Sequence, residues 1–433
     1  MLFPRRLLQA LLCAPVFGLA APMFAHAQSL PTLSIEEAIA LATTRAGNAE
    51  TSHGAVEASI QMAVAAGQLP DPILKLGLNN VPVNGPDQFS LSRDFMTMRS
   101  ISVMQEFTRS DKRKARAERF EAEAAAAEAQ RTVGLAGVQR GVALSWLERW
   151  YAEQTEALLG HHNHPLELEL EAATAAYRSG RGTRADVLAA EMEIQKLQDR
   201  RDENRAAIDV AKTNLERWVG QAASRPLSER PSLGISPRVQ QLVQADLDAL
   251  PELAASRRDI ALAEADVRVA TENRKPDVTV ELMYSQRGSA YSNMGSLNVS
   301  FPVPWDRGNR QDREVAAKLA QTQEARAKTE VISRNTRAMV AAKLAELQRN
   351  VDRLKRYDEK TLPLANAQAD AALTAYRANT GTLSAVAEAN HRTIDTAIER
   401  LTLEAKTARL WAELTYLIPL PTAQTEPAMK ESK

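Results

Sequence analysis

Two stretches of this 433-residue sequence decide its fold: "YRSGRGTRADVLAAE" at Tyr177–Glu191 and "YRANTGTLSAVAEAN" at Tyr376–Asn390. Both begin with Tyr-Arg, pass through Gly-Thr and continue into an Ala-rich pattern with helical spacing. They lie 199 residues apart, counted from Tyr177 to Tyr376. A motif repeated at such a distance indicates an internal duplication, and we interpret each copy as the turn of a helical hairpin.

Most of the remaining sequence predicts long helices, because Ala, Glu, Leu, Arg and Gln recur at helical spacing with little Gly or Pro. Ser34 followed by Glu37 is a capping box, which predicts a helix from there to about Gln68. Further helices are expected at 111–178, 184–218, 240–273, 310–377 and 383–416, with a Pro- and Gly-rich connector at 220–237. At about 1.5 Å per residue, the first of these would be roughly 100 Å long, more than an ordinary globular core requires.

Four short segments break the helical pattern, at residues 72–80, 100–107, 276–284 and 297–304. In the third, Val278, Val280 and Leu282 alternate with polar residues, and in the fourth Leu297 and Val299 do the same. This period of two predicts strands with one apolar and one polar face. Each half of the chain therefore runs helix, strand, strand, long helix, turn, helix. We expect a first repeat at 28–240 with its hairpin tip at 177–186, a second repeat at 241–420 with its tip at 376–385, and a polar tail at 421–433.

Residues 1–27 have the pattern of a secretory signal peptide. Arg5 and Arg6 form a basic start, an apolar run extends from Leu7 to Phe24, and Ala25-His26-Ala27 is a small-x-small cleavage site. An uncleaved N-terminal anchor is the alternative. We therefore expect the chain to leave the cytoplasm.

Charge and cysteine content exclude several classes of partner. Lys and Arg number 54 and Asp and Glu also 54, which argues against nucleic acid. Cys13, the only cysteine, lies in the predicted signal peptide, so no disulfide or cysteine metal site is expected. Leu12 before it is bulky, which argues against lipid attachment. After the signal peptide no run of about eighteen apolar residues predicts a transmembrane helix, although a secreted chain can still enter an outer membrane as a β-barrel.

Four strands are too few for a closed membrane barrel, which needs about eight or more. An open sheet edge in lipid leaves unpaired backbone groups, each at a cost of several kcal/mol. Three copies of the chain would supply twelve strands and close the edges. We therefore expect a mainly α protein with a membrane β-barrel, in which a homotrimer forms a 12-stranded barrel and the helices continue its wall. A non-channel periplasmic coiled coil is the alternative, but it leaves the four alternating strands without a role.

The repeated pattern, the Tyr-x-x-Gly-x-x-Thr turn and the signal peptide resemble the TolC-type outer-membrane efflux proteins over essentially all of residues 30–420. The stretch Leu69–Phe107, "LPDPILKLGLNNVPVNGPDQFSLSRDFMTMRSISVMQEF", is similar more narrowly to the heavy-metal cation branch, the CzcC-like proteins.

This resemblance implies a homotrimeric barrel in outer-membrane lipid with an α-helical periplasmic tunnel. The tunnel tips would dock on a periplasmic adaptor and an inner-membrane pump of the resistance–nodulation–division type. The exported substrate would be heavy-metal cations such as Co, Zn and Cd or Cu and Ag. Alternatives are a duct for drugs or for secreted polypeptides.

The resemblance also places the gate at the two hairpin tips. The turns are expected to use three glycines, because glycine accepts positive φ without steric cost: Gly180, Gly182 and Gly381. The gate is expected to use six further residues: Asp186, Tyr177, Tyr376, Arg181, Arg184 and Arg377. Opening would be an iris-like untwisting of the tips.

Two interpretations of Asp186 stay open. Three copies in a trimer would form a ring of carboxylates, which favours cations. Alternatively, Asp186 only caps the returning helix. The matching residue of the second repeat is Ala385, so a ring would have three members. The three arginines are expected to form salt bridges between tips, to contact the adaptor or simply to be solvated.

No metal site and no cofactor are predicted. His161, His162 and His164 lie close in sequence, but at these spacings a helix splays imidazoles apart, and Pro165 suggests a local kink. The thioethers of Met96, Met98 and Met104 are further soft donors, the first two of them in an expected outer loop. No nucleophile motif, phosphate loop or dinucleotide turn occurs, so we do not expect an enzyme.

Overall fold

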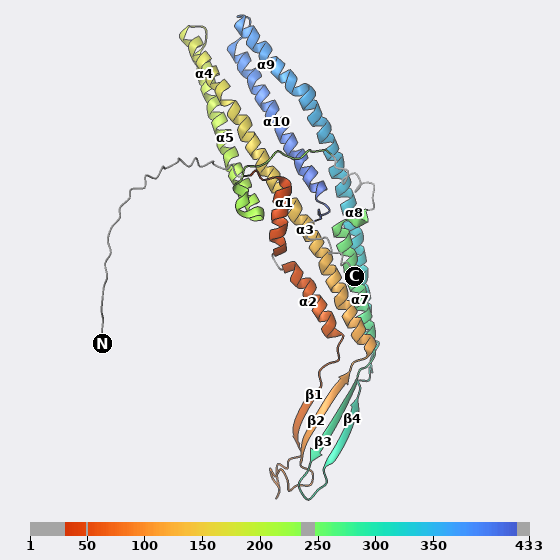
Figure 1. Ribbon diagram of the computed structural model, residues 1–433. Coiled ribbons are helices and arrows are strands. Elements are labelled where there is room, and N and C mark those ends of the chain that lie inside the picture. The colour runs from red at the N-terminus through yellow and green to blue at the C-terminus, as the bar shows by residue number, and fades with distance from the viewer. Residues whose placement is uncertain (1–30, 49–50, 235–246, 422–433) are drawn as a thin grey trace, which may run out of the picture.

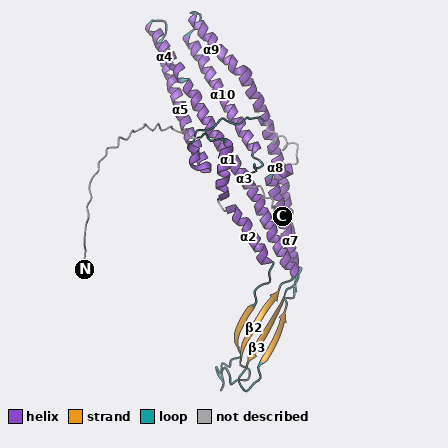
Figure 2. Ribbon diagram, in the orientation of Figure 1, coloured by secondary structure: helices purple, strands orange, loops and turns teal. Residues whose placement is uncertain are grey.

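The computed structural model describes residues 31–48, 51–234 and 247–421. The chain is elongated, with a four-stranded sheet at one end, long helices in the middle and two hairpin tips at the other end (Figure 1). Figure 2 shows that, in the described part of the chain, the strands are confined to the sheet end. The predicted fold class, mainly helical with long antiparallel hairpins and four strands, is confirmed. The predicted signal peptide and residues 422–433 of the predicted tail lie outside the described residues.

The first half of the chain has its elements in the expected order. They are α1 (Ile35–Asn48), α2 (Thr51–Ala66), β1 (Ile73–Asn79), β2 (Met98–Phe107), α3 (Ser110–His161), α4 (Asn163–Arg178) and α5 (Arg184–Val219). The N–H of Glu37 donates to Ser34 Oγ at 3.1 Å, so the predicted cap starts α1. The single helix expected to reach Gln68 is described in two parts, α1 and α2, on either side of residues 49–50, which lie outside the described residues.

The second half follows the same order. Its elements are η2 (Leu247–Ala249), α7 (Pro251–Glu272), β3 (Val278–Gln286), β4 (Met294–Ser300), α8 (Gln311–Arg356), η3 (Tyr357–Thr361), α9 (Leu362–Arg377) and α10 (Leu383–Thr415). Among the described residues the helix expected from 240 begins at Pro251, whose missing N–H suits a first helical position. The fourth strand ends at Ser300 and not at the predicted residue 304. Pro302 and Pro304 cannot donate to a sheet ladder, which explains the earlier end.

Both of the very long helices predicted from the sequence are interrupted near a proline. In the first half α3 ends at His161 and α4 begins at Asn163, just before Pro165. In the second half η3 is a single π-helical turn between α8 and α9, just before Pro363. Proline lacks the N–H for an i→i−4 bond and is tolerated in a helix mainly in its first turn, so each helix restarts there.

The sheet joins the two halves of the chain. All neighbouring strands are antiparallel in the order β1-β2-β3-β4, so β2 of the first half pairs with β3 of the second. β1 and β4 are the edge strands, and each pairs on one side only within the chain. The sheet therefore presents two unpaired edges.

One face of the sheet is apolar across all four strands. Leu74 pairs with Val103, Val103 with Leu282 and Leu282 with Leu297, which puts their side chains in one row. The same face carries Leu76, Leu78, Ile101, Val280, Tyr284 and Val299. Apart from Val280, which is partly buried, these side chains are exposed: Leu282 is 65% exposed and Leu297 66%. The alternation predicted from the sequence thus produces a continuous exposed apolar surface.

The opposite face of the sheet is polar. Lys75 of β1, Ser102 of β2 and Glu281 of β3 meet there. Glu281 Oε1 accepts hydrogen bonds from Ser102 Oγ at 2.7 Å and from Lys75 Nζ at 3.3 Å. The sheet is amphipathic, with opposite chemistry on its two faces.

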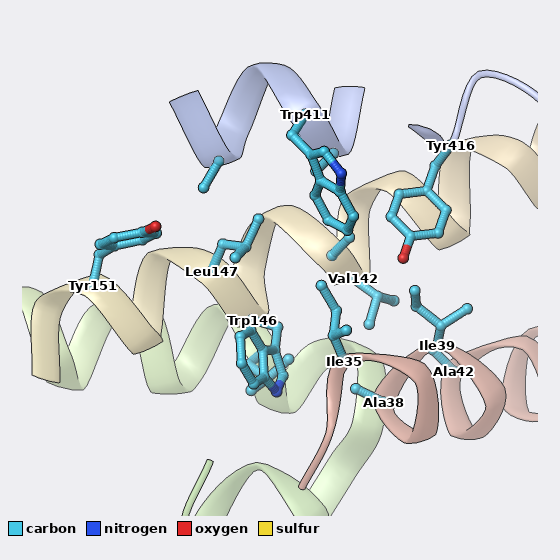
Figure 3. Close-up of a cluster of buried hydrophobic side chains, with 14 of the residues drawn as sticks. Ile35, Ala38, Ile39, Ala42, Val142, Trp146, Leu147, Tyr151, Trp411 and Tyr416 are labelled. Atoms are coloured by element: carbon cyan, nitrogen blue, oxygen red, sulfur yellow. The ribbon is translucent and has the colours of Figure 1, made fainter. Parts of the chain in front are cut away.

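The hydrophobic core lies where the helices are most tightly bundled. Figure 3 shows α3 between α1 and α10: Val142 and Trp146 face Ile35 and Ile39 of α1, and Trp411 of α10 approaches from the other side. Trp146 is fully buried, and its Nε1–H donates to the carbonyl of Leu33 at 3.0 Å. Truncating such a side chain typically costs about 3–5 kcal/mol, so this cluster is the main anchor of the bundle.

The predicted Pro- and Gly-rich connector lies across the bundle and ties its helices together. Arg225 Nη1 contacts Glu37 Oε1 at 2.7 Å, and this hydrogen bond is the main reason that the pKa of Glu37 is lowered. Trp150 Nε1 donates to the carbonyl of Ser228 at 3.1 Å. The connector thus links α1 and α3 in the middle of the molecule, between the sheet and the hairpin tips.

No helix in the described part of the chain is both long enough and apolar enough to cross a membrane.

Candidate functional site at the hairpin tips

The first hairpin tip turns between α4 and α5. The N–H of Ser179 donates to the carbonyl of Ala175 at 3.0 Å, and that of Arg181 to the carbonyl of Ala176 at 2.9 Å. Gly180 between them has φ 71°, the left-handed conformation in which many helices end. The turn therefore depends on local hydrogen bonds and one positive φ.

A capping box formed by Thr183 and Asp186 starts α5. Thr183 Oγ1 accepts from the Asp186 N–H at 3.2 Å, and Asp186 Oδ2 accepts from the Thr183 N–H and hydroxyl, both at 2.8 Å. The bond from the Thr183 backbone, and then that from its side chain, lower the pKa of Asp186, because both favour the ionised carboxylate. Asp186 therefore caps the helix and stays charged at neutral pH, so its two proposed roles are compatible.

The second tip, between α9 and α10, repeats this geometry with different residues. Asn379 supplies the positive φ, at 59°, where the first tip has Gly180. Thr382 caps α10 by accepting from the Ala385 N–H at 3.2 Å. Ala385 has no carboxylate to complete a capping box, so the two tips differ in charge.

Two of the three glycines have a different role from the one expected. Only Gly180 of the three has positive φ; Gly182 and Gly381 do not. A Cβ on Gly182 would lie 3.0 Å from Ala176 Cβ, and one on Gly381 would lie 3.1 Å from Ala375 Cβ. These two glycines therefore permit close approach of the turn to the preceding helix and not an unusual φ.

A groove of about 420 Å³ separates the two hairpins near their tips. Its walls come from both, and Asp186 lies opposite Leu383 and Ser384 of the second hairpin. Five carboxylates line the groove, against one guanidinium and one imidazole: Glu169, Asp186, Glu193, Glu388 and Asp395, with Arg392 and His391. The acidic groups outnumber the basic ones, which favours cations in the groove.

Two pairs of ionisable side chains connect the first hairpin with α10 of the second. Arg200 Nη1 of α5 lies 3.2 Å from Asp395 Oδ1 of α10, and His391 Nε2 of α10 lies 4.0 Å from Glu169 Oε2 of α4. Burial raises the pKa of Glu169; the charge of His391 opposes this shift and that of Glu193 adds to it. Sequence analysis did not select these residues, because no short-range pattern connects residues about two hundred positions apart.

No protein-family model and no curated relative matches the chain. Solved structures do. VceC, an outer membrane protein from Vibrio cholerae, matches with a TM-score of 0.72 and 18% identity over 88% of this chain and 95% of that chain. CusC, whose structures describe transmembrane channel formation, matches with a TM-score of 0.73 and 14% identity over 90% and 94%. The open MtrE outer membrane channel of Neisseria gonorrhoeae matches with a TM-score of 0.62 and 14% identity over 88% of each chain.

The chain has the fold of these proteins. At such low identities the likeness extends to the fold alone. The similarity of Leu69–Phe107 to the heavy-metal branch stays a prediction.

The remaining tip residues predicted from the sequence are accessible. Tyr177 is half exposed, Tyr376 is partly buried, and Arg181, Arg184 and Arg377 are exposed. Arg181 Nε donates to Ser179 Oγ at 3.3 Å, within its own turn. Arg184 and Arg377 make no ion pair with any other described residue, so both are free to contact another molecule.

The histidines around the interruption of the first long helix do not converge. His164 is exposed and lies 3.9 Å from Glu167 within α4, and burial, followed by the charge of His161, lowers the pKa of His162. Across the described ranges, no group of three or more His, Cys, Asp or Glu side chains is arranged to hold a metal ion.

The methionines noted in the sequence occupy different positions. Met96 lies in the loop between β1 and β2, whereas Met98, expected in that loop, begins β2. Met104 lies in β2 on the polar face of the sheet, where its Sδ accepts from Lys75 Nζ at 3.3 Å.

Proposed function

We propose that this protein is the outer-membrane channel of a tripartite efflux system. It conducts substrates passively from the periplasm or cytoplasm to the outside and is not an enzyme. An inner-membrane pump of the resistance–nodulation–division type supplies the energy, and a periplasmic adaptor connects the pump to the hairpin tips.

The amphipathic sheet is the observation that carries this proposal. Its apolar face is exposed from edge to edge, whereas a water-soluble protein rarely exposes so large a contiguous apolar surface. Its strands have 7 to 10 residues, about the length of tilted membrane strands. Lipid would cover the apolar face, and the face with Lys75 and Glu281 would line a water-filled lumen.

The unpaired edges of the sheet support a homotrimer. Within the chain β1 and β4 each lack a partner on one side, which in lipid costs several kcal/mol per unsatisfied backbone group. Pairing β4 of one copy with β1 of the next would close a twelve-stranded barrel from three copies. Exposed apolar residues on one face of α5, such as Leu188, Met192 and Val210, would be covered in the same assembly.

The helical hairpins would form the periplasmic tunnel, and the tips would form its gate. Both tips lie at the end of the molecule farthest from the sheet (Figure 1). In a trimer three copies of Asp186 would form an acidic ring at the narrow end, and Arg181, Arg184 and Arg377 would face neighbouring tips or the adaptor. Opening would separate the tips as in an iris.

Heavy-metal cations such as Co, Zn and Cd or Cu and Ag are the proposed substrates. The excess of carboxylates in the groove between the hairpins supports cation passage, as does the resemblance of Leu69–Phe107 to the heavy-metal branch. A duct for drugs or secreted polypeptides is the second candidate, and a periplasmic coiled coil is the third.

Membrane fractionation and electrophoresis test the channel. The protein should partition with the outer membrane, migrate as a trimer unless heated, and produce ion conductance in planar bilayers. A detergent-free, water-soluble monomer would instead support the coiled coil and overturn the channel. A variant with charged residues at Leu76 and Leu282, on the apolar face, should fail to insert into the membrane.

Deletion of the gene separates the candidate substrates. Sensitivity to metal salts, restored by the wild-type gene, is expected; sensitivity only to organic drugs would favour the second candidate. The gate is tested with cysteines at Arg181 and Arg377, because the exported chain should hold no other thiol. Oxidative cross-linking between neighbouring tips should stop export and reduction should restore it; normal export by the cross-linked protein would contradict the gate.

A further inference from the structure

Trp305 is 93% exposed, unlike every other tryptophan of the chain. Trp146 and Trp411 are buried, and Trp150 and Trp218 pack against the same core. An indole is large and apolar with one polar N–H, so full contact with water is unfavourable. Trp305 therefore needs a partner outside the chain.

The position of Trp305 indicates the kind of partner. It follows β4 at the end of the sheet nearest the helices, after Phe301 and Val303, which are 59% and 63% exposed. On the apolar face at the same end of the sheet, Phe107 is 48% exposed and pairs with Val278. Aromatic side chains thus mark the helix-side limit of the apolar face. Tryptophan is enriched where the hydrocarbon of a bilayer meets its headgroups.

Basic residues follow Trp305 closely in the sequence, and another precedes the helix α3. Arg109 precedes α3, Arg307 and Arg310 precede α8, and Arg313 lies in its first turn; all four are exposed. Arg307 Nε lies 3.2 Å from Asp312 Oδ1, whereas the other three make no ion pair with a described residue. The helices α3 and α8 meet the sheet at this level (Figure 1).

The charge at the start of α3 conflicts with helix electrostatics. Its first two turns, "SDKRKAR", carry Lys112, Arg113, Lys114 and Arg116 against one acidic residue, Asp111. Cations are unfavourable at a helix N-terminus because the macrodipole is positive there. Lys112 has Asp277 at 2.6 Å and Lys114 has Glu118 at 3.9 Å, so an anionic partner at this level would compensate the charge that remains on Arg113 and Arg116.

We propose that Trp305, Arg109, Arg307, Arg310 and Arg313 form an aromatic–basic collar that binds anionic phospholipid headgroups on the periplasmic side of the outer membrane. This inference rests on the proposed membrane insertion of the sheet. The indole lies at the hydrocarbon boundary, and the guanidinium groups extend beyond it to the phosphates. The collar sets how deeply the sheet enters the membrane and selects the lipid around it.

Tryptophan quenching by brominated lipid tests the collar. The difference between wild-type and Trp305→Phe emission, with both proteins inserted in vesicles, reports Trp305 alone. Bromine placed shallowly on the acyl chain should quench it more than bromine placed deeply. Brominated phosphatidylglycerol should quench several-fold more than brominated phosphatidylcholine at the same low mole fraction, and added salt should reduce this preference.

The arginines are tested by repeating this measurement in a background that carries Arg307→Gln, Arg310→Gln and Arg313→Gln. The preference for phosphatidylglycerol should then fall to about that of phosphatidylcholine. A control background with Arg334→Gln, Arg349→Gln and Arg356→Gln has the same charge change farther along α8, at exposed positions, and should keep the preference. An unchanged preference in the first background would overturn the role of the arginines.

Flotation with the vesicles separates the two proposals. If the protein floats but brominated lipid does not quench Trp305 emission, the channel proposal stands and the collar proposal is wrong. Protein that does not float overturns membrane insertion, and the collar fails with it.

Discussion

The ion pair between Lys112 and Asp277 should hold the sheet to the helices. Lys112 Nζ lies 2.6 Å from Asp277 Oδ2 and donates to the carbonyl of Lys275 at 2.9 Å, which connects α3 to the start of β3. The side chains of Lys112 and Asp277 are only 6% and 16% exposed. Lys112→Met therefore leaves a largely buried carboxylate without its cation.

The size of the effect follows from this burial. Removing one partner of a buried ion pair typically costs about 3–5 kcal/mol. Asp277 keeps the backbone N–H of Arg109 at 3.1 Å and some contact with water, which places Lys112→Met near the lower limit. A loss of about 3 kcal/mol is a more than hundredfold change in the unfolding equilibrium. The double variant Lys112→Met/Asp277→Leu should recover most of the loss, because it removes the uncompensated charge.

Guanidinium unfolding in detergent, followed by tryptophan fluorescence, measures these differences as shifts of the midpoint at constant slope. Lys114→Met is the matched control. Its ammonium is 77% exposed and lies 3.9 Å from Glu118, so its loss should cost under about 1 kcal/mol. The reasoning is refuted if Lys112→Met is no less stable than Lys114→Met, or if the double variant is less stable than Lys112→Met.

Three further predictions concern the hairpins, and thermal midpoints check each. Because the folded pKa of Asp186 is lowered below 3.8, its ionised form adds stability above that pH and loses it as the pH falls through the folded value. Asp186→Asn should therefore be less stable than wild type at neutral pH and equal to it in strong acid; equal stability at both would contradict the prediction. The folded pKa of Glu169 is raised above 4.5. The free energy of unfolding should therefore rise as the pH falls through this raised, folded-state pKa. Glu169→Gln should be more stable at neutral pH, whereas exposed Glu171→Gln should change little. Gly182→Ala should lose about 1–3 kcal/mol, because its Cβ would meet Ala176 Cβ at 3.0 Å; Gly160→Ala, with open space around it, should gain up to about 1 kcal/mol.

The sequence predicted the local structure of the candidate site well. One of the two interpretations of Asp186 was that it caps the returning helix, and the capping box with Thr183 forms with both hydrogen bonds. The roles of Gly182 and Gly381 could not be predicted, because a close approach to the preceding helix depends on how the turn folds back. The groove was also missed, since contacts such as that of Glu169 with His391 join residues that no local pattern connects.

The sequence alone determined the duplicated hairpins, the amphipathic strands and the capped helix starts. These features arise from hydrogen bonds and periodicities within a few residues, so the local sequence suffices to predict them. Only the tertiary structure decided that β2 pairs with β3 across the two halves, where the long helices are interrupted, and which charges meet between the hairpins. Those features depend on packing between segments far apart in the chain, where the same local pattern is compatible with many partners.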